Sequence, residues 1–233
     1  MFHSKKSKKK KPLKLERNLV TISDSKSIIS EQFRTIRTNI TFSVTDEELK
    51  TLLVTSSIPG EGKSTNAANI GVVFAQEGKK VLIVDADMRR PTLHHTFRLS
   101  NTDGLSNVLI RKQTVQKAIQ ETAIVGLYIM TSGPLPPNPS ELLASKTMEA
   151  FIKVVEQEYD LIIFDSPPLL PVTDAQILSH KCNGTLLIVD MNIAKKADVI
   201  KAKVSLTNSQ AKIMGVVLNN SALPRDHYHY QYQ

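Results

Sequence analysis

The stretch Ser56-Ser57-Ile58-Pro59-Gly60-Glu61-Gly62-Lys63-Ser64-Thr65 joins an apolar run typical of a strand to a run of small residues typical of a helix. Its two glycines allow backbone N–H groups to turn inward onto phosphate oxygens, beside the positive end of the following helix. Lys63 would reach the β- and γ-phosphates of a nucleotide, and the Ser64 hydroxyl would bind Mg²⁺. The stretch therefore predicts a P-loop, although Ser57 stands where the usual pattern has its first glycine. The residues expected to contact the nucleotide here are Pro59, Gly60, Glu61, Gly62, Lys63, Ser64 and Thr65.

Two other apolar runs end in acidic residues. Residues 81–84 lead into Asp85-Ala86-Asp87, and residues 161–164 lead into Asp165. A single Asp after a strand usually caps a helix or forms a turn. Three such carboxylates in this order after a P-loop instead indicate a Mg²⁺-nucleotide site, where a carboxylate holds the ion directly or through water.

The rest of the chain alternates short apolar runs with helical segments. This alternation predicts an α/β fold of the P-loop NTPase type, with a mostly parallel sheet and helices on both faces. Ligands of such sheets bind beyond the carboxyl ends of the strands. Asn138, Pro139 and Glu141 predict the start of one helix. The expected strands are 51–55, 80–84, 127–131, 161–164, 185–189 and 213–218, and the expected helices are 64–76, 140–157, 174–181 and 197–208.

The composition limits the class of protein. The chain has 233 residues, of which 41% are hydrophobic and 22% charged, as in globular proteins. It contains no apolar run of about 18 residues, so we expect no membrane span. The single cysteine, Cys182, excludes a disulfide framework and a thiolate metal cluster within one chain. The expected compartment is the reducing cytosol.

The net charge of +8 is concentrated at one end of the chain. Residues 1–17 contain eight Lys and Arg residues against one Glu, so they carry seven of the eight net charges. We expect residues 1–20 to form a basic tail, either solvated or attracted to anionic lipid. The rest of the chain carries only +1, and nucleic-acid binding is therefore not expected.

An amphipathic helix is predicted over residues 27–42, ahead of the P-loop, from apolar residues at helical spacing. Glu31, Arg34 and Arg37 lie three residues apart and share one stripe of this helix. The spacing by itself indicates an exposed Glu–Arg pair, which would stabilise the helix by about 0.2–0.5 kcal/mol.

Three of the five tyrosines, Tyr228, Tyr230 and Tyr232, lie in the last six residues. The terminal segment is short and polar, and we expect it to be mobile. A strand of alternating aromatics packed on the sheet is the alternative. The expected organisation is a folded domain over residues 21–221, followed by a tyrosine-rich tail over 222–233.

The three motifs, together with Ser-Gly-Pro-Leu-Pro-Pro-Asn-Pro-Ser-Glu-Leu-Leu at 132–143, resemble the bacterial tyrosine kinases that control capsule and exopolysaccharide synthesis. The resemblance extends from about residue 27 to the C-terminus. It identifies 57–64, 81–87 and 161–165 as the family's Walker A, A′ and B motifs. The MinD/ParA ATPases share this fold, but they carry a signature lysine where this chain has Ile58.

The resemblance implies an ATP-dependent kinase that phosphorylates Tyr228, Tyr230 and Tyr232. Lys63, Asp85 and Asp87 would be its catalytic residues. One of the two aspartates would act as base, and the other would help hold Mg²⁺. The magnesium ligands would be Ser64, Asp87 and Asp165. Asn219 corresponds to the place where related ATPases read adenine, although Asn219-Asn220 is equally a turn.

The resemblance also implies partners. Glu31, Arg34 and Arg37 match the family's subunit-contact motif, which implies a ring where one subunit's tail enters its neighbour's site. A transmembrane adaptor of the polysaccharide co-polymerase type would recruit the kinase to the inner face of the membrane, and a cognate tyrosine phosphatase would oppose it. The alternatives are a MinD/ParA-like ATPase that positions a partner, and a nucleotide-sensing scaffold without activity.

Overall fold

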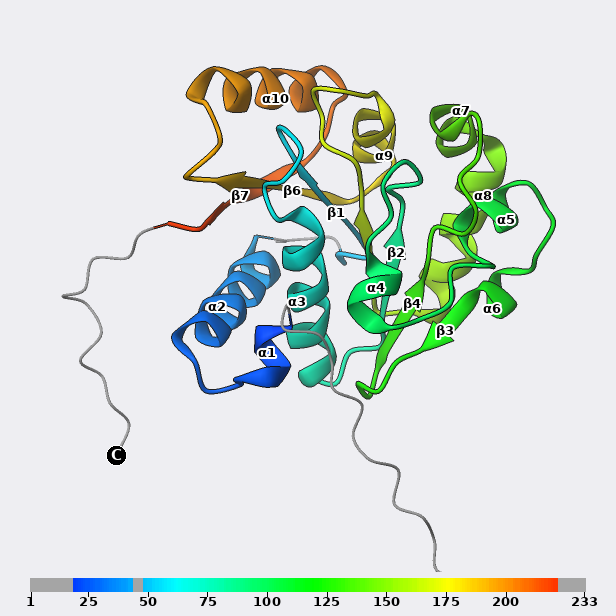
Figure 1. Cartoon of the computed structure of the whole chain (residues 1–233), viewed down its shortest axis with the longest axis horizontal. Coiled ribbons are helices and arrows are strands. Elements are labelled where there is room, and N and C mark those ends of the chain that lie inside the picture. The colour runs from blue at the N-terminus through cyan, green and yellow to red at the C-terminus, as the bar shows by residue number, and fades with distance from the viewer. Residues whose placement is uncertain (1–18, 44–47, 222–233) are drawn as a thin grey trace, which may run out of the picture.

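A seven-stranded sheet forms the centre of the computed structural model, which describes residues 19–43 and 48–221 (Figure 1). Its strands lie in the order β3-β4-β2-β5-β1-β6-β7. All neighbours are parallel except β3 and β4. The predicted α/β, mostly parallel architecture is confirmed. The strands are β1 (Thr51–Ser56), β2 (Val81–Asp85), β3 (Ile119–Glu121), β4 (Leu127–Met130), β5 (Leu161–Asp165), β6 (Gly184–Asp190) and β7 (Ile213–Asn219).

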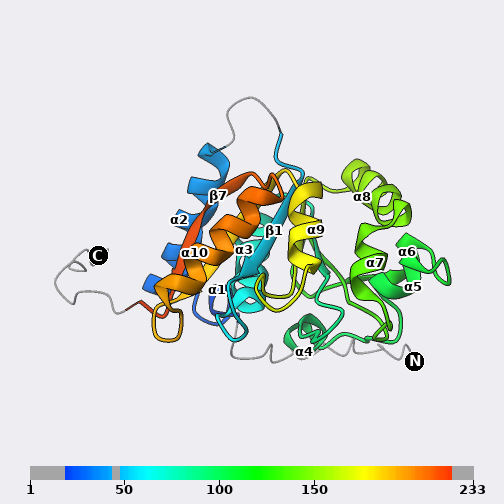
Figure 2. The same ribbon diagram turned by 90° about the horizontal axis from the view of Figure 1, so that it is seen from above.

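Helices cover both faces of the sheet, as Figure 2 shows from above. One face carries α1 (Val20–Ser23), α2 (Ile28–Phe42), α3 (Lys63–Gln76) and α4 (Leu93–Phe97). The apolar clusters of the other face contain residues of α5 (Leu105–Leu109), α6 (Val115–Ala118), α7 (Pro139–Ala144), α8 (Lys146–Glu158), α9 (Asp174–Lys181) and α10 (Lys196–Asn208). None of the helices described is both long and apolar enough to span a lipid bilayer.

The central strands are buried along their whole length. Successive residues point to opposite faces, so Leu52 and Val54 pack under α3 while Leu53 packs under α8 and α9. This double burial explains why these strands read as continuous apolar runs rather than as alternating patterns. Burial on both faces also fixes the positions of the carboxyl ends of these strands, and the three motifs lie at that edge of the sheet.

The helix expected over 140–157 is in fact two helices, and this expectation was wrong. Ser145 has extended backbone angles (φ −70°, ψ 156°) and ends α7. Its hydroxyl accepts the N–H of Met148 and so caps α8. Pro139 occupies the first turn of α7 as predicted, but Asn138 caps no N–H group and donates instead to the Glu141 carboxylate at 2.6 Å.

The start of the fold was not foreseen. Leu19, within the expected tail, is fully buried, and α1 follows it at once. Thr21 donates from both its N–H and its hydroxyl to Asn69 Oδ1 on α3. The short elements α1, α4, α5, α6 and β3 span too few residues to show a periodic pattern, and long-range packing determines them. The helix expected over 27–42 is present as α2 and is capped by Ser27.

Candidate functional site

The predicted site residues meet at the carboxyl edge of the sheet. The P-loop follows β1, and β1 lies beside β5, which lies beside β2. Asp85 and Asp165 are direct register partners at the ends of β2 and β5. The topology therefore brings together three motifs that lie at 57–64, 81–87 and 161–165 in the sequence.

The P-loop needs its glycines for conformation and for space. Gly60 and Gly62 have φ values of +90° and +86°, which side chains rarely adopt. A Cβ atom on Gly62 would lie 2.3 Å from the Asn219 side-chain nitrogen. α3 begins directly at Lys63, so its free N–H groups and positive end face the place of the phosphates.

Lys63 lies among three carboxylates. Its Nζ is 2.9 Å from Asp87 Oδ2 and 3.8 Å from Asp165 Oδ1. Burial lowers the pKa of Lys63, but Asp165, Asp87 and Asp85 together outweigh burial and raise it. Lys63 is therefore a fixed positive charge at the centre of the site.

The two aspartates after β2 have different surroundings. Asp87 lines the cavity beside the P-loop, pairs with Lys63, and accepts the N–H groups of Arg89 and Arg90. Asp85 is fully buried, and its Oδ2 accepts the N–H groups at the start of α4. Burial, the neighbouring Asp165 and Asp87 raise the pKa of Asp85 well above its ordinary value.

Asp165 is also fully buried, and neither of its oxygens has a hydrogen-bond partner among the described residues. Burial raises its pKa, against the lowering influence of Lys63 and of the nearby Ser64 hydroxyl. Asp85 Oδ1 is likewise without a partner in the described structure. Buried carboxylate oxygens without partners cost free energy unless a cation or a proton satisfies them.

These oxygens, which lack hydrogen-bond partners among the residues described, fit Mg²⁺, which prefers oxygen ligands. The described residues contain no group of three or more His, Cys, Asp or Glu side chains arranged to hold a metal alone. Mg²⁺ commonly takes one or two carboxylates and completes its shell with substrate phosphates and water. The Ser64 hydroxyl, Asp87 and Asp165 suit that arrangement.

Two cavities flank the P-loop. One, of about 560 Å³, lies on the side of Lys63 and Asp87, and its lining includes Arg89, Arg90 and four prolines. The other, of about 970 Å³, runs between α2, the start of α3 and β7, and its lining includes Thr65 and Asn219. The predicted nucleotide-contacting residues Pro59, Gly60, Gly62, Lys63, Ser64 and Thr65 line the first cavity.

Two predicted contact residues have roles within the protein. Glu61 lines neither cavity, because its carboxylate turns back beneath the loop and accepts the N–H of Ile58. Asn219 donates to the Glu61 carbonyl oxygen at 3.0 Å while lining the second cavity. Asn219 thus braces the P-loop from the end of β7.

Sequence reasoning missed Arg89. Its guanidinium binds both oxygens of the buried Asp174 on α9, at 2.8 and 3.0 Å, and donates to the Ser140 hydroxyl on α7. Such bidentate pairs fix geometry as well as charge. Arg89 thereby ties the loop that carries Asp87 to the opposite wall of the cavity. Its position two residues after Asp87 was the only available signal.

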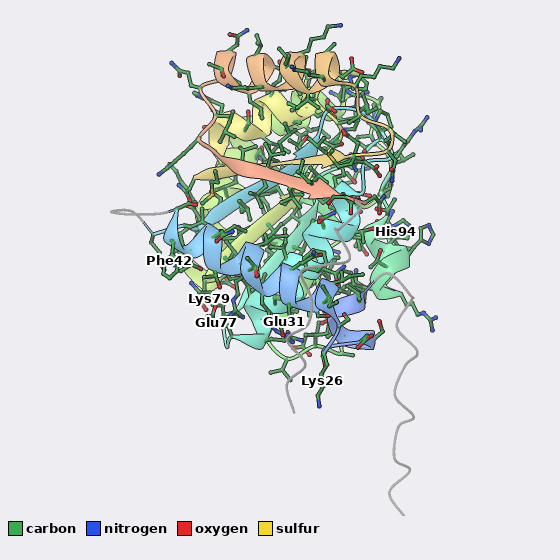
Figure 3. The ribbon with its side chains drawn as sticks, turned by 90° about the vertical axis from the view of Figure 1, so that its left-hand side faces the viewer. Lys26, Glu31, Phe42, Glu77, Lys79 and His94 are labelled. Atoms are coloured by element: carbon green, nitrogen blue, oxygen red, sulfur yellow. The ribbon has the colours of Figure 1, made fainter. Side chains whose placement is uncertain are left out.

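The predicted subunit-contact residues have partners within their own chain. Arg34 pairs with Glu31 and also donates to the Ser25 carbonyl. Arg37 donates to the Val73 carbonyl on α3 and pairs with Glu77 at 3.4 Å. Figure 3 looks onto α2 on this side of the molecule, with Glu31 towards one end and Phe42 at the other. Through its contacts with Val73 and Glu77, Arg37 also holds α2 against α3.

The three terminal tyrosines lie outside the described residues. The other two, Tyr128 and Tyr159, pack edge to face with the Lys80 ammonium beside both rings. Tyr159 is buried, and desolvation with smaller effects of neighbouring groups raises its pKa to about 12. Tyr128 and Tyr159 are thus structural residues.

Comparison with known proteins identifies the family. A family model described as an AAA domain matches residues 49–193. The chain is 45% identical to tyrosine-protein kinase YwqD of Bacillus subtilis (strain 168) over 225 residues, which cover 97% of this chain and 94% of YwqD. It is 44% identical to the putative tyrosine-protein kinase CapB of Staphylococcus aureus, covering 89% of this chain and 91% of CapB. The chain belongs to the AAA-domain family of bacterial tyrosine-protein kinases.

Solved structures agree with this assignment. This tyrosine kinase superimposes on the chimerical protein CapA2B2 with a TM-score of 0.86 and 43% identity, covering 88% of this chain and 91% of that one. The kinase domain of Escherichia coli ETK gives a TM-score of 0.83 and 31% identity, covering 92% and 84%. The cell division ATPase MinD of Pyrococcus furiosus is more distant, with a TM-score of 0.62, 26% identity and coverage of 72% and 71%. The resemblance stated from the motifs is confirmed.

Proposed function

We propose that this kinase transfers the γ-phosphoryl group of ATP to tyrosines of its own C-terminal tail, and that it regulates capsule or exopolysaccharide synthesis in this way. The observation that carries the proposal is the position of Lys63, 2.9 Å from Asp87 and 3.8 Å from Asp165, at the mouth of a cavity beside the P-loop. Incubation of the purified chain with ATP and Mg²⁺, followed by mapping of phosphate by mass spectrometry, tests it.

The residues divide the chemistry between them. Lys63 and the P-loop N–H groups neutralise charge on the phosphates. Ser64, Asp87 and Asp165 would hold Mg²⁺, which would supply further positive charge against the phosphates. The bond between the tyrosine oxygen and the γ-phosphorus forms as the bond to the β-phosphate oxygen breaks, and ADP leaves. A tyrosine hydroxyl has an ordinary pKa near 10, so it arrives protonated, and the carboxylate of Asp85 or Asp87 accepts its proton.

Adenosine would extend from Thr65 into the larger cavity beside Asn219, while the acceptor tyrosine would enter the smaller one. The lining supports this division: the side-chain amides of Asn192, Asn219 and Asn220 line the larger cavity, and prolines line the smaller one. Amides can read a base, and a proline surface suits a phenol ring.

We expect that changing Tyr228, Tyr230 and Tyr232 together to Phe removes nearly all phosphotyrosine from the purified kinase. Tyr128 and Tyr159 are packed against Lys80 and cannot replace them as acceptors. The measurement is phosphate incorporation, read by mass spectrometry. Tyr128→Phe serves as the control and should keep wild-type incorporation. Undiminished phosphotyrosine in the triple variant would contradict tail phosphorylation.

A MinD/ParA-like ATPase cycle is the alternative function, and Ile58 argues against it. The residue in the place of the signature lysine is apolar, and its backbone N–H is already bound to Glu61. This alternative predicts steady ATP hydrolysis without phosphotyrosine, which the same incubation distinguishes.

The kinase would assemble into a ring through α2, so that one subunit's tail reaches its neighbour's site. We expect Arg34→Ala, alone and with Arg37→Ala, to reduce the mass in solution, measured by light scattering. Arg34→Ala is the sharper test, because Arg37 also anchors α2 on α3. Lys26→Ala, on the same side of the molecule (Figure 3), is the control. An unchanged mass in both Arg variants would refute the interface.

The remaining partners complete the proposal. A transmembrane adaptor of the co-polymerase type would recruit the kinase from the cytoplasm to the inner face of the membrane, and a tyrosine phosphatase would reverse the reaction. The support is the likeness of this chain to the named tyrosine-protein kinases and to the chimerical protein CapA2B2. Co-purification of the adaptor with the kinase tests this arrangement.

A further inference from the structure

Glu61 is a buried carboxylate inside a loop that must bind anions. Its side chain is fully buried. Among the residues described, no Lys, Arg or His forms an ion pair with it. A negative charge beneath a phosphate site repels the ligand, so its presence there needs a physical reason.

The Glu61 carboxylate closes the loop on itself. Its Oε2 accepts the Ser57 hydroxyl at 2.7 Å and the Ile58 N–H at 2.8 Å. These two donors are at the first residues of the loop, and Glu61 is near its end. Ser57 is the residue that replaces the usual first glycine, so the departure from the common pattern is matched by a partner within the same loop.

The same side chain also ties the loop to the sheet. Its Oε1 accepts the N–H of Asp190 at the end of β6, at 3.2 Å. The Glu61 carbonyl accepts the Asn219 amide at 3.0 Å, and the Asp190 carboxylate accepts the Asn220 amide at 2.7 Å. The P-loop is thus joined through Glu61 to the ends of both β6 and β7. These strands lie on the opposite side of β1 from the strands that lead to Asp85, Asp87 and Asp165.

We propose that Glu61 is a positioning residue for nucleotide binding, and that the Ser57–Glu61 pair sets the phosphate loop in its binding shape before ATP arrives. The inference rests on the proposed nucleotide site. A loop that is already ordered loses less conformational entropy when the phosphates bind, and its N–H groups need no reorientation. In this proposal, the free energy of ATP binding that the ordered loop saves is larger than the repulsion between the Glu61 carboxylate and the phosphates.

The test measures the Kd of ATP with Mg²⁺ for the full chain by calorimetry. Glu61→Gln keeps the size of the side chain but replaces one acceptor oxygen with a donor nitrogen, which then faces an N–H or O–H donor. We expect ATP to bind about 10- to 100-fold more weakly, as the loss of a charge-assisted hydrogen bond predicts. Ser57→Ala should weaken binding about 2- to 10-fold. The double variant should lose less than the product of the two factors, because both remove the same bond.

Kinetics separate positioning from catalysis: Glu61→Gln should raise the KM for ATP more than it lowers kcat. Asn183→Ala is the matched control. Asn183 accepts the N–H groups of Lys50 and Thr51 at the other end of β1, so its loss should lower the Tm and leave the ATP affinity unchanged.

Wild-type ATP affinity in Glu61→Gln, whatever its Tm, overturns the proposal. If Glu61→Gln does not fold, an unchanged affinity in Ser57→Ala overturns it instead. All these titrations use a chain that also carries Tyr228→Phe, Tyr230→Phe and Tyr232→Phe, so no tail acceptor is present and the measured affinity is independent of the kinase reaction. A wild-type chain that binds ATP but forms no phosphotyrosine would refute the proposed function and leave this test in place.

Discussion

Lys63→Met is expected to lower the rate of autophosphorylation by about 10²- to 10³-fold or more, the loss typical of removing a single preorganised charge-stabilising group. Methionine matches the length of the lysine stem but carries no charge. The ammonium of Lys63 faces Asp87, Asp165 and Asp85, so its removal deprives both the phosphates and the three carboxylates of their cation. Phosphotyrosine after incubation with ATP and Mg²⁺ is the measurement.

The control for Lys63→Met is the same substitution at Lys181. Lys181 pairs with Glu149 at 2.7 Å, between α9 and α8, and its ammonium takes no part in the P-loop site. Lys181→Met should keep wild-type activity. Circular dichroism must show that Lys63→Met is folded. Phosphotyrosine at the wild-type level in a folded Lys63→Met chain would sink the proposed mechanism.

Asp85→Asn should lower activity and raise stability at the same time. With Asp85 as the base, the expected loss of activity is roughly 10²- to 10⁴-fold, the range for removing a general base. The stability gain has a separate cause. Because burial and two neighbouring carboxylates raise the pKa of Asp85, ionising it destabilises the folded chain. Asparagine keeps an oxygen for the N–H groups of Thr92 and Leu93 without the charge.

The pH dependence of this gain has a definite sign. Below the ordinary Asp pKa of 3.8, Asp85 is protonated in both folded and unfolded chains and costs nothing. As pH rises above that value, the unfolded chain ionises first, so wild-type stability falls until the raised pKa of the folded chain is passed. The advantage of Asp85→Asn should therefore be small near pH 4 and grow towards neutral pH, as measured by denaturant unfolding without nucleotide.

Asp160→Asn is the matched control for Asp85→Asn. Asp160 also accepts a backbone N–H, that of Lys80 at 2.7 Å, but it lies at the other end of β2. The Asp160→Asn variant should be neither more stable nor less active than the wild-type kinase. Equal stability of Asp85→Asn and wild type at neutral pH would contradict the buried charge. Comparison of Asp85→Asn with Asp87→Asn separates the two roles. Substitution of the residue that binds magnesium should raise the Mg²⁺ concentration needed for activity, and substitution of the base should not.

Much of the site followed from local sequence. Lys63, Ser64, Asp85, Asp87 and Asp165 each end or follow an apolar strand, and a parallel sheet must collect such ends at one edge. The long apolar runs predicted the central strands for the same reason, since double burial leaves no polar positions in them. Short elements such as α4 and β3 carry no such pattern and were missed.

The sequence by itself therefore determined the class of fold, the family, and which P-loop and acidic residues meet at the carboxyl edge of the sheet, because these depend on the order of residues along the chain. Only the tertiary structure decided which groups act together. It turned Glu61 away from the cavity and towards Ser57, set Arg89 against Asp174, and gave Arg37 a partner on α3. Arg89 and Arg37 have these roles through contacts between distant segments, and Glu61 through burial within its own loop, so no local pattern records them.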